Sequence, residues 1–488
     1  MLATGLPPGV GLVGYIRKCR RRPSAYSAYD EAFARGHMHV PQSGNLSDPG
    51  GIGKAVMVAA ASLTFDALAS ADRAPLVAFL LRDLNCGGPH RMAFILAEAL
   101  ADRGARIDLV VCDARGNLRS EVPPRARLVN LQRTNPLSAR LAALRADLRA
   151  IPALAGPVLQ FRRGLRTLPY LPDLATYLRN AEPNALLAAT PHLNIIAVLA
   201  RRLAGAPTRV VVSERNNLSE GKPGRARRSR RLAAALRRTY LQADAIVAVS
   251  NGVAADLART TGIPRQAITT IYNPAITPDF PAKLSEPVDH TWFGKDAVVP
   301  VVLGVGRLSP QKDFATLCRA FARVRRERPA RLVIIGDVRG HESDRDHRLA
   351  GLYRLAAELG VRDDFELLGY QRNPFRYMAR AAVFALSSRF EGFGNVLLEA
   401  LACGTPVVST DCPSGPAEIL DGGAYGALVP VGDDAAMAAA IEAALDHPPD
   451  PARLRARAAM FDFETTIARY EAILLGRACS VFAPHEQL

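Results

Sequence analysis

From Pro75 onward, short apolar runs alternate with stretches of helical periodicity, and this alternation limits the fold more than any other feature. The runs are continuously apolar, which is typical of strands buried on both faces of a parallel sheet. Parallel strands need crossover connections, which are right-handed, so the pattern predicts a doubly wound α/β domain. The expected strands of this first series are 76–81, 107–112, 185–189, 209–212, 245–249 and 268–271.

A second series of the same kind begins near Ala297. Between the two series lies 277–295, which is rich in proline and charge and is interpreted as an interdomain linker. The fold class is therefore α/β, with two tandem Rossmann-like, doubly wound domains. Ligands bind outside the carboxyl ends of such strands, so the chain carries two strand-end crevices. The expected strands of the second series are 299–305, 331–335, 365–368, 383–386 and 406–409.

Charge and cysteine content narrow the class of protein. The 488 residues carry a formal net charge of +16, which favours acidic partners such as nucleic acid, an anionic lipid surface or a phosphorylated substrate. The seven cysteines are scattered and form no CxxC pair, which argues for reduced thiols and against a disulfide scaffold or a zinc site. Continuous apolar stretches stay below about 18 residues, so no spanning helix is predicted.

Residues 1–73 lack a sustained period and are expected to be a poorly ordered N-terminal extension, or the result of a start codon assigned too early, with Met57 as an alternative start. A membrane-touching arm is the other interpretation, because a basic cluster, 17–22, precedes the apolar run 55–63.

The strongest motif runs from Arg389 to Ala400, between an expected strand and an expected helix. Its glycines let backbone amides approach an anion, and the helix N-terminus adds partial positive charge there. Glu391 and Glu399 are eight residues apart, a spacing that lets two carboxylates reach opposite ends of a nucleotide-sugar. The alternative is a surface loop with one capping glutamate.

These residues resemble the E-x7-E signature of family 4 retaining glycosyltransferases with the B-type fold, of the bacterial polysaccharide and lipid-linked glycan type. The resemblance covers about residues 75–475. It implies an N-terminal acceptor-binding domain, 74–285, facing a donor-binding domain, 296–460, across a cleft. The segment 461–488 would hold a helix that crosses back toward the N-terminal domain, and a tail. Further matching segments are 212–216, 271–274, 304–313, 402–409 and 411–420.

The resemblance also implies roles for residues of the second domain. Arg307 and Lys312 match the basic pair that holds the donor diphosphate, and two fixed cations suit a leaving group that gains charge. Glu399 matches the carboxylate that accepts hydrogen bonds from the ribose, and Glu391 matches the residue that touches the sugar near the reacting carbon. The remaining donor-binding positions are Gly392, Phe393, Gly394 and Asn395, which face the sugar and phosphate, and Gly369 and Tyr370, which hold the base.

In the first domain, the family has a Gly-Gly loop that approaches the donor phosphate and the acceptor, matched here by Gly87 and Gly88. Many relatives carry glutamate where this chain has His90, and that departure puts the acceptor contact in doubt. His192 is a catalytic candidate that would face the sugar. Two acceptor-side candidates, Glu214 and Asn216, end the next strand. The alternative for these last three residues is capping of the helices that follow.

The family resemblance implies retention of configuration, no metal requirement and a nucleotide-sugar donor, for which the segment 412–416 favours a UDP-sugar. Two other classes stay open: an epimerase of the same fold and a non-catalytic paralogue. Nucleic-acid binding is not favoured, because no helix-turn-helix or aromatic platform is apparent.

The acceptor is expected to be a glycan or a polyprenyl-linked glycan in lipopolysaccharide or other cell-surface polysaccharide biosynthesis. Residues Arg215–Tyr240 hold nine lysines or arginines and one acid, which suits peripheral contact with an anionic membrane. A solvated basic face is the alternative. The expected location is the cytoplasm, at the inner face of the cell membrane.

Overall fold

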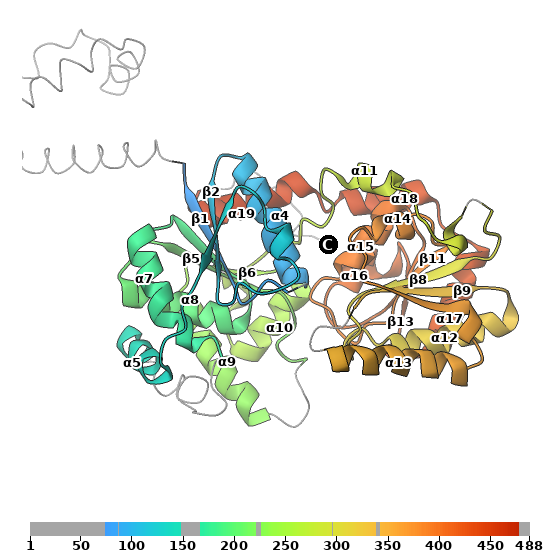
Figure 1. The fold of residues 1–488 in the computed structure, drawn as a ribbon, viewed down its shortest axis with the longest axis horizontal. Coiled ribbons are helices and arrows are strands. Elements are labelled where there is room, and N and C mark those ends of the chain that lie inside the picture. Colours follow the sequence, from blue (N-terminus) through green and yellow to red (C-terminus); the bar gives the residue numbers. More distant parts are fainter. Residues whose placement is uncertain are drawn as a thin grey trace, which may run out of the picture. The chain divides into compact units, whose positions relative to one another are not determined.

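The computed structural model describes residues 74–85, 87–147, 166–220, 226–294, 296–337 and 342–477. Two parallel sheets with helices around them confirm the predicted pair of doubly wound α/β domains (Figure 1). The predicted N-terminal extension, 1–73, lies outside the described residues, as does Cys86. No helix in the described ranges is long and apolar enough to cross a membrane.

Among the described residues, the first sheet holds seven parallel strands in the order β3-β2-β1-β4-β5-β6-β7. The strand order reverses between β1 and β4, so the loops that follow these two strands diverge to opposite faces and leave a crevice between them. The strands are β1 (Leu76–Leu81), β2 (Arg106–Val111), β3 (Ala126–Asn130), β4 (Ala185–Ala188), β5 (Arg209–Glu214), β6 (Ala245–Ala248) and β7 (Ile268–Thr270).

The described part of the second half of the chain forms a sheet of six parallel strands in the order β10-β9-β8-β11-β12-β13. Its order reverses between β8 and β11, which again places a crevice at the carboxyl ends of these two strands. The strands are β8 (Val301–Val305), β9 (Arg331–Ile335), β10 (Phe365–Gly369), β11 (Val383–Leu386), β12 (Val407–Thr410) and β13 (Ala427–Val429).

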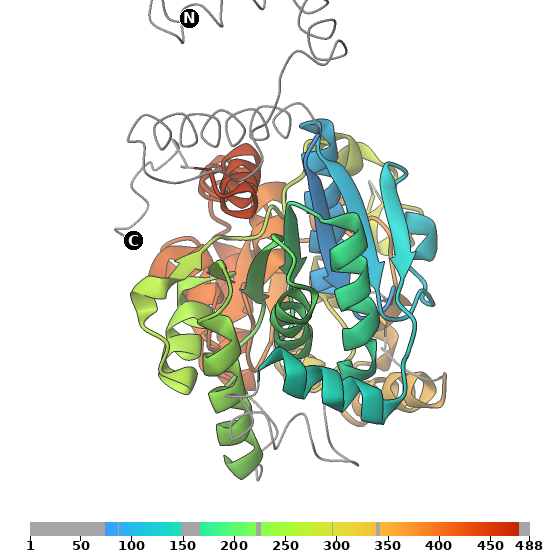
Figure 2. The ribbon, with the colours of Figure 1, turned by 90° about the vertical axis from the view of Figure 1, so that its left-hand side faces the viewer.

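Helices cover both sheets, as parallel strands require. In the first domain α8 packs against β1, β4 and β5, and Figure 2 shows the green helices of this domain in front of its strands. The longer helices of the first domain are α4 (Gly88–Asp102), α5 (Pro136–Ala146), α7 (Leu171–Ala181), α8 (Pro191–Ala204), α9 (Ala226–Tyr240) and α10 (Asn251–Thr261). Those of the second half are α12 (Phe314–Glu327), α13 (Glu342–Glu358), α15 (Asn395–Cys403), α17 (Asp434–Asp446) and α18 (Pro451–Ala459), with the shorter α11 (Phe280–Ser285), α14 (Phe375–Met378) and α16 (Pro416–Leu420).

The last helix, α19 (Phe463–Leu475), returns to the first domain, where Figure 1 labels it beside β1 and β2. It contacts α4, β4 and β5. Arg103 at the end of α4 pairs with Glu464 and Glu471 of this helix at 2.5 and 3.0 Å. The chain therefore crosses between the domains twice, and the second crossing is anchored by packing as well as by charge.

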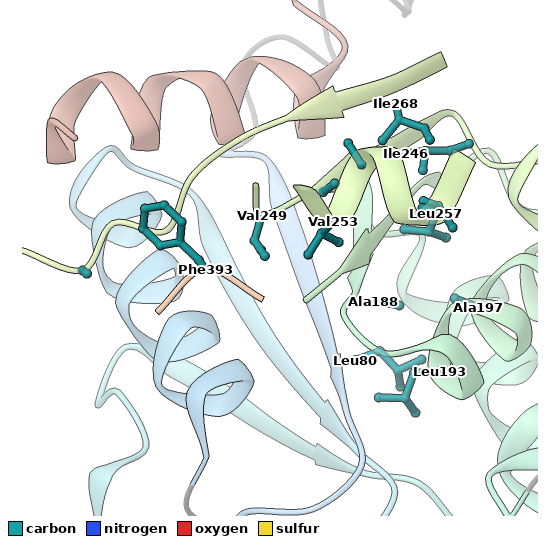
Figure 3. Packing of buried hydrophobic residues seen from close by; sticks show 14 of the residues in the cluster. Leu80, Ala188, Leu193, Ala197, Ile246, Val249, Val253, Leu257, Ile268 and Phe393 are labelled. Atoms are coloured by element: carbon teal, nitrogen blue, oxygen red, sulfur yellow. The ribbon is translucent and has the colours of Figure 1, made fainter. Parts of the chain in front are cut away.

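A cluster of buried apolar side chains contains residues of both domains. Phe393 of the second domain belongs to the same cluster as Val249 and Val253 of the first, and Figure 3 shows the three near one another. Phe393 also stacks on Tyr272, with ring centroids 5.1 Å apart. Burial of such side chains favours a packed domain interface, because each large apolar side chain removed from water contributes about 1.5–3 kcal/mol.

The predicted strands match the buried strands within a residue or two, but β3 and β13 were not predicted. Both lie at edges of their sheets and are only partly buried, so they lack the continuous apolar run that marks a central strand. The expected linker, 277–295, contains the helix α11, and Phe280 of that helix is buried against Phe375. The linker is therefore packed on the second domain.

Candidate active site

The crevice of the second sheet brings together the two loops with the strongest motifs. Arg307 and Lys312 follow β8, whereas Glu391 follows β11, and these strands are neighbours in the sheet. Since parallel strands end at the same edge, residues 79 positions apart in the chain meet there. The predicted basic pair and the predicted sugar-facing carboxylate are thus placed at one edge of one sheet.

Lys312 and Glu391 form a nearly buried ion pair, with 2.6 Å between Nζ and Oε1. The hydroxyl of Ser388 donates to the same carboxylate oxygen at 2.6 Å. A buried pair of this kind is stable only when both charges are satisfied. A ligand that supplies an anion to Lys312 and a hydroxyl to Glu391 is able to take the place of each partner.

Gln311 connects Arg307 to the loop that carries Glu391. Its side-chain oxygen accepts from Nη2 of Arg307 at 3.4 Å, and its amide nitrogen donates to the carbonyl of Phe390 at 2.9 Å. Its own carbonyl accepts from the amide of Arg389 at 2.7 Å. Gln311 was not predicted as a site residue, although it lies inside the segment that resembles the family.

Glu399 lies on α15 and is buried. Its Oε1 is 3.8 Å from Nη1 of Arg91, which belongs to the first domain. Its Oε2 has no hydrogen-bond partner among the described residues. Burial raises the pKa of Glu399, while the charges of Arg91, Lys312 and Lys283 oppose the rise. A buried carboxylate oxygen without a partner is costly, so it favours a ligand that donates a hydrogen bond.

The glycine-rich turn before α15 lies directly against the backbone of the first domain. A Cβ added at Gly392 would lie 2.0 Å from the backbone oxygen of Arg215 in the first domain, so only glycine fits. Gly394 precedes the helix with a φ of 95°, which also favours glycine. The side chain of Asn395 accepts from that of Asn273 at 2.7 Å, whereas Phe393 is buried among aromatic rings. The side chain of Phe393 is therefore part of the core, and only its backbone remains for a ligand.

Three strand-end glycines of the second domain stack closely beside the crevice. A Cβ at Gly336 would lie 1.8 Å from the backbone oxygen of Gly306, and the amide of Gly336 donates to the carbonyl of Gly369 at 2.8 Å. The next residue, Tyr370, is partly exposed at 45%. The backbone at the predicted base-binding position is thus held in place beside an exposed aromatic side chain.

Gly87 and Gly88 begin α4 at the end of β1, the switch point of the first sheet. Space around Gly88 is open, since an added Cβ would contact nothing within 4 Å. His90 is buried, with Nε2 3.5 Å from Oδ1 of Asp83. The departure from the family pattern at His90 therefore coincides with an acidic partner, Asp83, that was not predicted from the sequence.

The remaining predicted residues of the first domain have different surroundings. His192 is exposed at the start of α8, and Asn216 is half-buried beside Gly392. Glu214, by contrast, is fully buried and accepts hydrogen bonds from Tyr240 and Asn194. Burial raises the pKa of Glu214 to about 8. This interior position does not support an acceptor-side role for Glu214, because an acceptor cannot reach a side chain enclosed by α8 and α9.

Three polar residues that hold the domains together were not predicted as site residues. Asn217 donates to the carbonyls of Glu391 and Pro413, at 3.3 and 3.1 Å. Ser250 donates to the carbonyl of Gly392 at 2.6 Å. The carboxylate of Glu418 accepts from the first two amides of α10, at 2.9 and 2.7 Å, an arrangement that also suits the helix dipole. No local sequence signal marks Asn217 or Ser250, because their partners lie in the other domain.

The basic segment Arg215–Tyr240 is partly used within the molecule. Arg215, Arg237 and Arg238 bond to Asn273, to the carbonyl of Gly262 and to Asp147. Arg230 and Arg231 are exposed on α9. The side chains of residues 221–229 lie outside the described part.

The described residues contain no group of three or more His, Cys, Asp or Glu side chains arranged to hold a metal ion. The absence of a metal requirement remains a prediction that an assay must test.

Two family profiles match the chain. Residues 86–277 match the profile described as "Glycosyltransferase Family 4", and residues 299–447 match "Glycosyl transferases group 1". The first match covers the first sheet from α4 onward, and the second covers the second sheet with its crevice.

Characterised relatives match over part of the chain. One is the N-acetylgalactosamine-N,N'-diacetylbacillosaminyl-diphospho-undecaprenol 4-alpha-N-acetylgalactosaminyltransferase of Campylobacter jejuni, 36% identical over 198 residues, which are 41% of this chain and 50% of the relative. Another is the lipopolysaccharide core biosynthesis glycosyltransferase LpsE of Rhizobium meliloti, 38% identical over 155 residues, or 32% and 42% of the two chains. The chain thus spans half or less of the length of these relatives.

Among solved structures, Anabaena Alr3699/HepE in complex with UDP and glucose is similar, with a TM-score of 0.62 and 20% identity over 82% of this chain and 100% of that chain. At that identity the likeness concerns the fold. The profile matches, the pair of sheets and the motif geometry together lead to one conclusion: the chain belongs to family 4 of the glycosyltransferases and has their B-type fold.

Proposed function

We propose that the chain is a glycosyltransferase that transfers a sugar from a nucleoside diphosphate sugar to a glycan or lipid-linked glycan. The observation that carries the proposal is the pairing of Lys312 with Glu391 beside the buried, partly unsatisfied Glu399, at the switch point of the second sheet. Lys312 and the two carboxylates match what a sugar diphosphate offers: phosphate oxygens that accept hydrogen bonds, and sugar and ribose hydroxyls that donate them.

In the proposed reaction, the bond between the anomeric carbon and the diphosphate oxygen breaks, and the acceptor oxygen bonds to the same carbon. The diphosphate leaves with the bonding electrons, and the acceptor proton passes to the departing oxygen. Arg307 and Lys312 stabilise the charge that develops on the leaving group. Glu391 fixes the sugar, so the protein contributes position and charge rather than a proton acceptor.

This scheme predicts retention of configuration and transfer without added divalent metal, because the two cations take the role of the ion. Glu391 as a nucleophile would also give retention, through two displacements. Loss of transfer in the presence of a chelator, with full recovery only on adding Mn²⁺, would count against the scheme.

The donor is proposed to be a UDP-sugar carrying a hexose or an N-acetylhexosamine. Two findings support this choice: the fold resembles that of Anabaena Alr3699/HepE, whose structure contains UDP, and the name of the Campylobacter relative specifies an N-acetylgalactosaminyltransferase. A thermal-shift panel of UDP-, GDP- and ADP-sugars tests the choice, since the nucleotide that binds raises the unfolding temperature in proportion to its occupancy.

The acceptor is proposed to be a polyprenyl-linked or lipopolysaccharide-type glycan at the cytoplasmic face of the membrane. The names of the relatives, which refer to diphospho-undecaprenol and to lipopolysaccharide core, support this class. The net charge of +16 and the exposed Arg230 and Arg231 support contact with anionic lipid. Vesicle cosedimentation should increase with the anionic lipid fraction, and binding that does not depend on that fraction would remove the membrane proposal.

Glu391→Ala provides the direct test of the proposed reaction. This variant is expected to lose transfer while it retains affinity for the nucleoside diphosphate, because Arg307, Lys312 and Glu399 remain. Product analysis without an acceptor separates the alternative activity: an epimerase would convert the sugar nucleotide alone, whereas a transferase would leave it unchanged or hydrolyse it slowly.

A further inference from the structure

Arg91 reaches from the first domain to the nucleotide side of the crevice. It lies on the first turns of α4, and its Nη1 is 3.8 Å from Oε1 of Glu399 in the second domain. Its guanidinium carbon is 5.3 Å from the ring centroid of Phe375, also in the second domain. The side chain is 41% exposed, so a ligand has access to it.

The Arg91–Glu399 pair parallels the Lys312–Glu391 pair. In each, a cation at the crevice contacts an acid for which a hydroxyl-binding role is proposed. Among the charges that counter the burial of Glu399, that of Arg91 is the largest, ahead of Lys312 and Lys283. Arg91 is therefore a main source of the positive charge that faces Glu399.

The contact between Arg91 and Glu399 is weaker than the contact that Arg91 could form with a phosphate. A separation of 3.8 Å exceeds a hydrogen bond, so Arg91 and Glu399 attract each other without a directed bond. A phosphate oxygen offers a guanidinium shorter, paired hydrogen bonds. Ribose hydroxyls, in turn, offer donors to the Glu399 oxygen that has no hydrogen-bond partner among the described residues. Exchange of partners thus satisfies both groups better.

We propose that Arg91 is a diphosphate-binding residue, which changes its partner from Glu399 to a phosphate oxygen when the ribose occupies Glu399. The inference rests on the proposed function and deepens it, because the leaving group is then held by Arg307 and Lys312 from the second domain and by Arg91 from the first. Release of the diphosphate is thereby coupled to the contact between the domains.

The test compares a nucleoside diphosphate with its nucleoside on the full chain. The probe is whichever of UDP, GDP and ADP binds the wild type most tightly by calorimetry, and the matching nucleoside is titrated by ligand-observed NMR. Arg91→Ala is expected to weaken the diphosphate about tenfold or more and to change nucleoside affinity less than about threefold, because only the phosphates lose a charged hydrogen bond. Arg91→Lys keeps the positive charge but loses the paired donors of the guanidinium, so its diphosphate affinity is expected to lie between those of the wild type and Arg91→Ala.

Arg125→Ala is the matched control, because Arg125 forms an exposed pair with Asp102 in the same domain. It is expected to leave both affinities unchanged. Equal weakening of nucleoside and diphosphate by Arg91→Ala, or no weakening of either, would overturn the inference while the proposed function stands. If none of the three diphosphates binds the wild type, both the proposed function and the inference fail.

Discussion

Gly392→Ala tests whether close approach of the domains is needed for transfer. The new Cβ would lie 2.0 Å from the backbone oxygen of Arg215 and 3.3 Å from Cα of Asn216. Real Cβ atoms essentially never come within 3.0 Å of such a neighbour, so the two segments must separate by about 1 Å. The obstacle is backbone, and no change of rotamer relieves it.

A misplacement of about 1 Å is enough to lower a rate roughly 100-fold when catalysis depends on position. Gly392→Ala should therefore reduce kcat of sugar transfer by about that factor. The Kd of the nucleoside diphosphate should rise by no more than it does in Arg91→Ala, because Arg307, Lys312 and Glu399 lie within the second domain and only the contact with Arg91 crosses between the domains. Steady-state transfer assays and calorimetry measure the two quantities.

Gly351→Ala on α13 is the matched control, because its added Cβ contacts nothing within 4 Å and its surroundings are exposed. It should leave kcat unchanged. Wild-type kcat in Gly392→Ala would refute the argument that the interdomain contact at Gly392 positions the reacting groups. A loss of diphosphate affinity larger than that of Arg91→Ala would show instead that the glycine turn itself is distorted.

Three further predictions concern stability. Lys312→Met should lower the free energy of unfolding by about 3 kcal/mol, because it leaves the buried charge of Glu391 unpaired. In denaturant unfolding, the double variant with Glu391→Gln should recover part of that loss. Strictly additive losses in the two single variants and the double variant would contradict the pairing. Glu418→Ala should cost about 1–2 kcal/mol by uncapping α10, and Glu418→Gln should cost less; equal losses would argue against the cap. Burial raises the pKa of Glu214 to about 8, so the folded state holds this proton more tightly than the unfolded chain does. The free energy of unfolding of the wild type should therefore fall relative to that of Glu214→Gln as pH rises from about 4.5 to 8. The fall should be at most about 1.4 kcal/mol per pH unit. Parallel plots of Tm against pH for the two proteins would contradict it.

The second domain was predictable because its signals are local. Each central strand is a continuous apolar run. Arg307, Lys312 and Glu391 follow recognisable strands, and Glu399 lies inside the helix that the motif predicts. The topology then dictates that the loops after β8 and β11 lie at the same edge of the sheet. The Lys312–Glu391 contact is thus a consequence of strand order rather than of proximity in the chain.

The first domain was less predictable because its functional features depend on long-range contacts. Glu214 ends a strand as a site residue would, yet its side chain turns inward to Tyr240, a residue 26 positions away. Asn217 and Ser250 matter through carbonyls of the other domain, which leave no trace in the local sequence. Arg91 directly follows His90 and the Gly-Gly loop in the sequence, but its partner Glu399 is more than 300 residues away.

The most direct test of the account is a crystal structure of the chain with the nucleoside diphosphate that binds it most tightly. We expect the diphosphate oxygens within hydrogen-bond distance of Lys312 Nζ and the Arg307 guanidinium, and the ribose hydroxyls within hydrogen-bond distance of the Glu399 carboxylate. A nucleotide bound elsewhere would contradict it, for example in the cavity of about 550 Å³ that Arg127, Asp173 and Tyr177 line beside the edge of the first sheet.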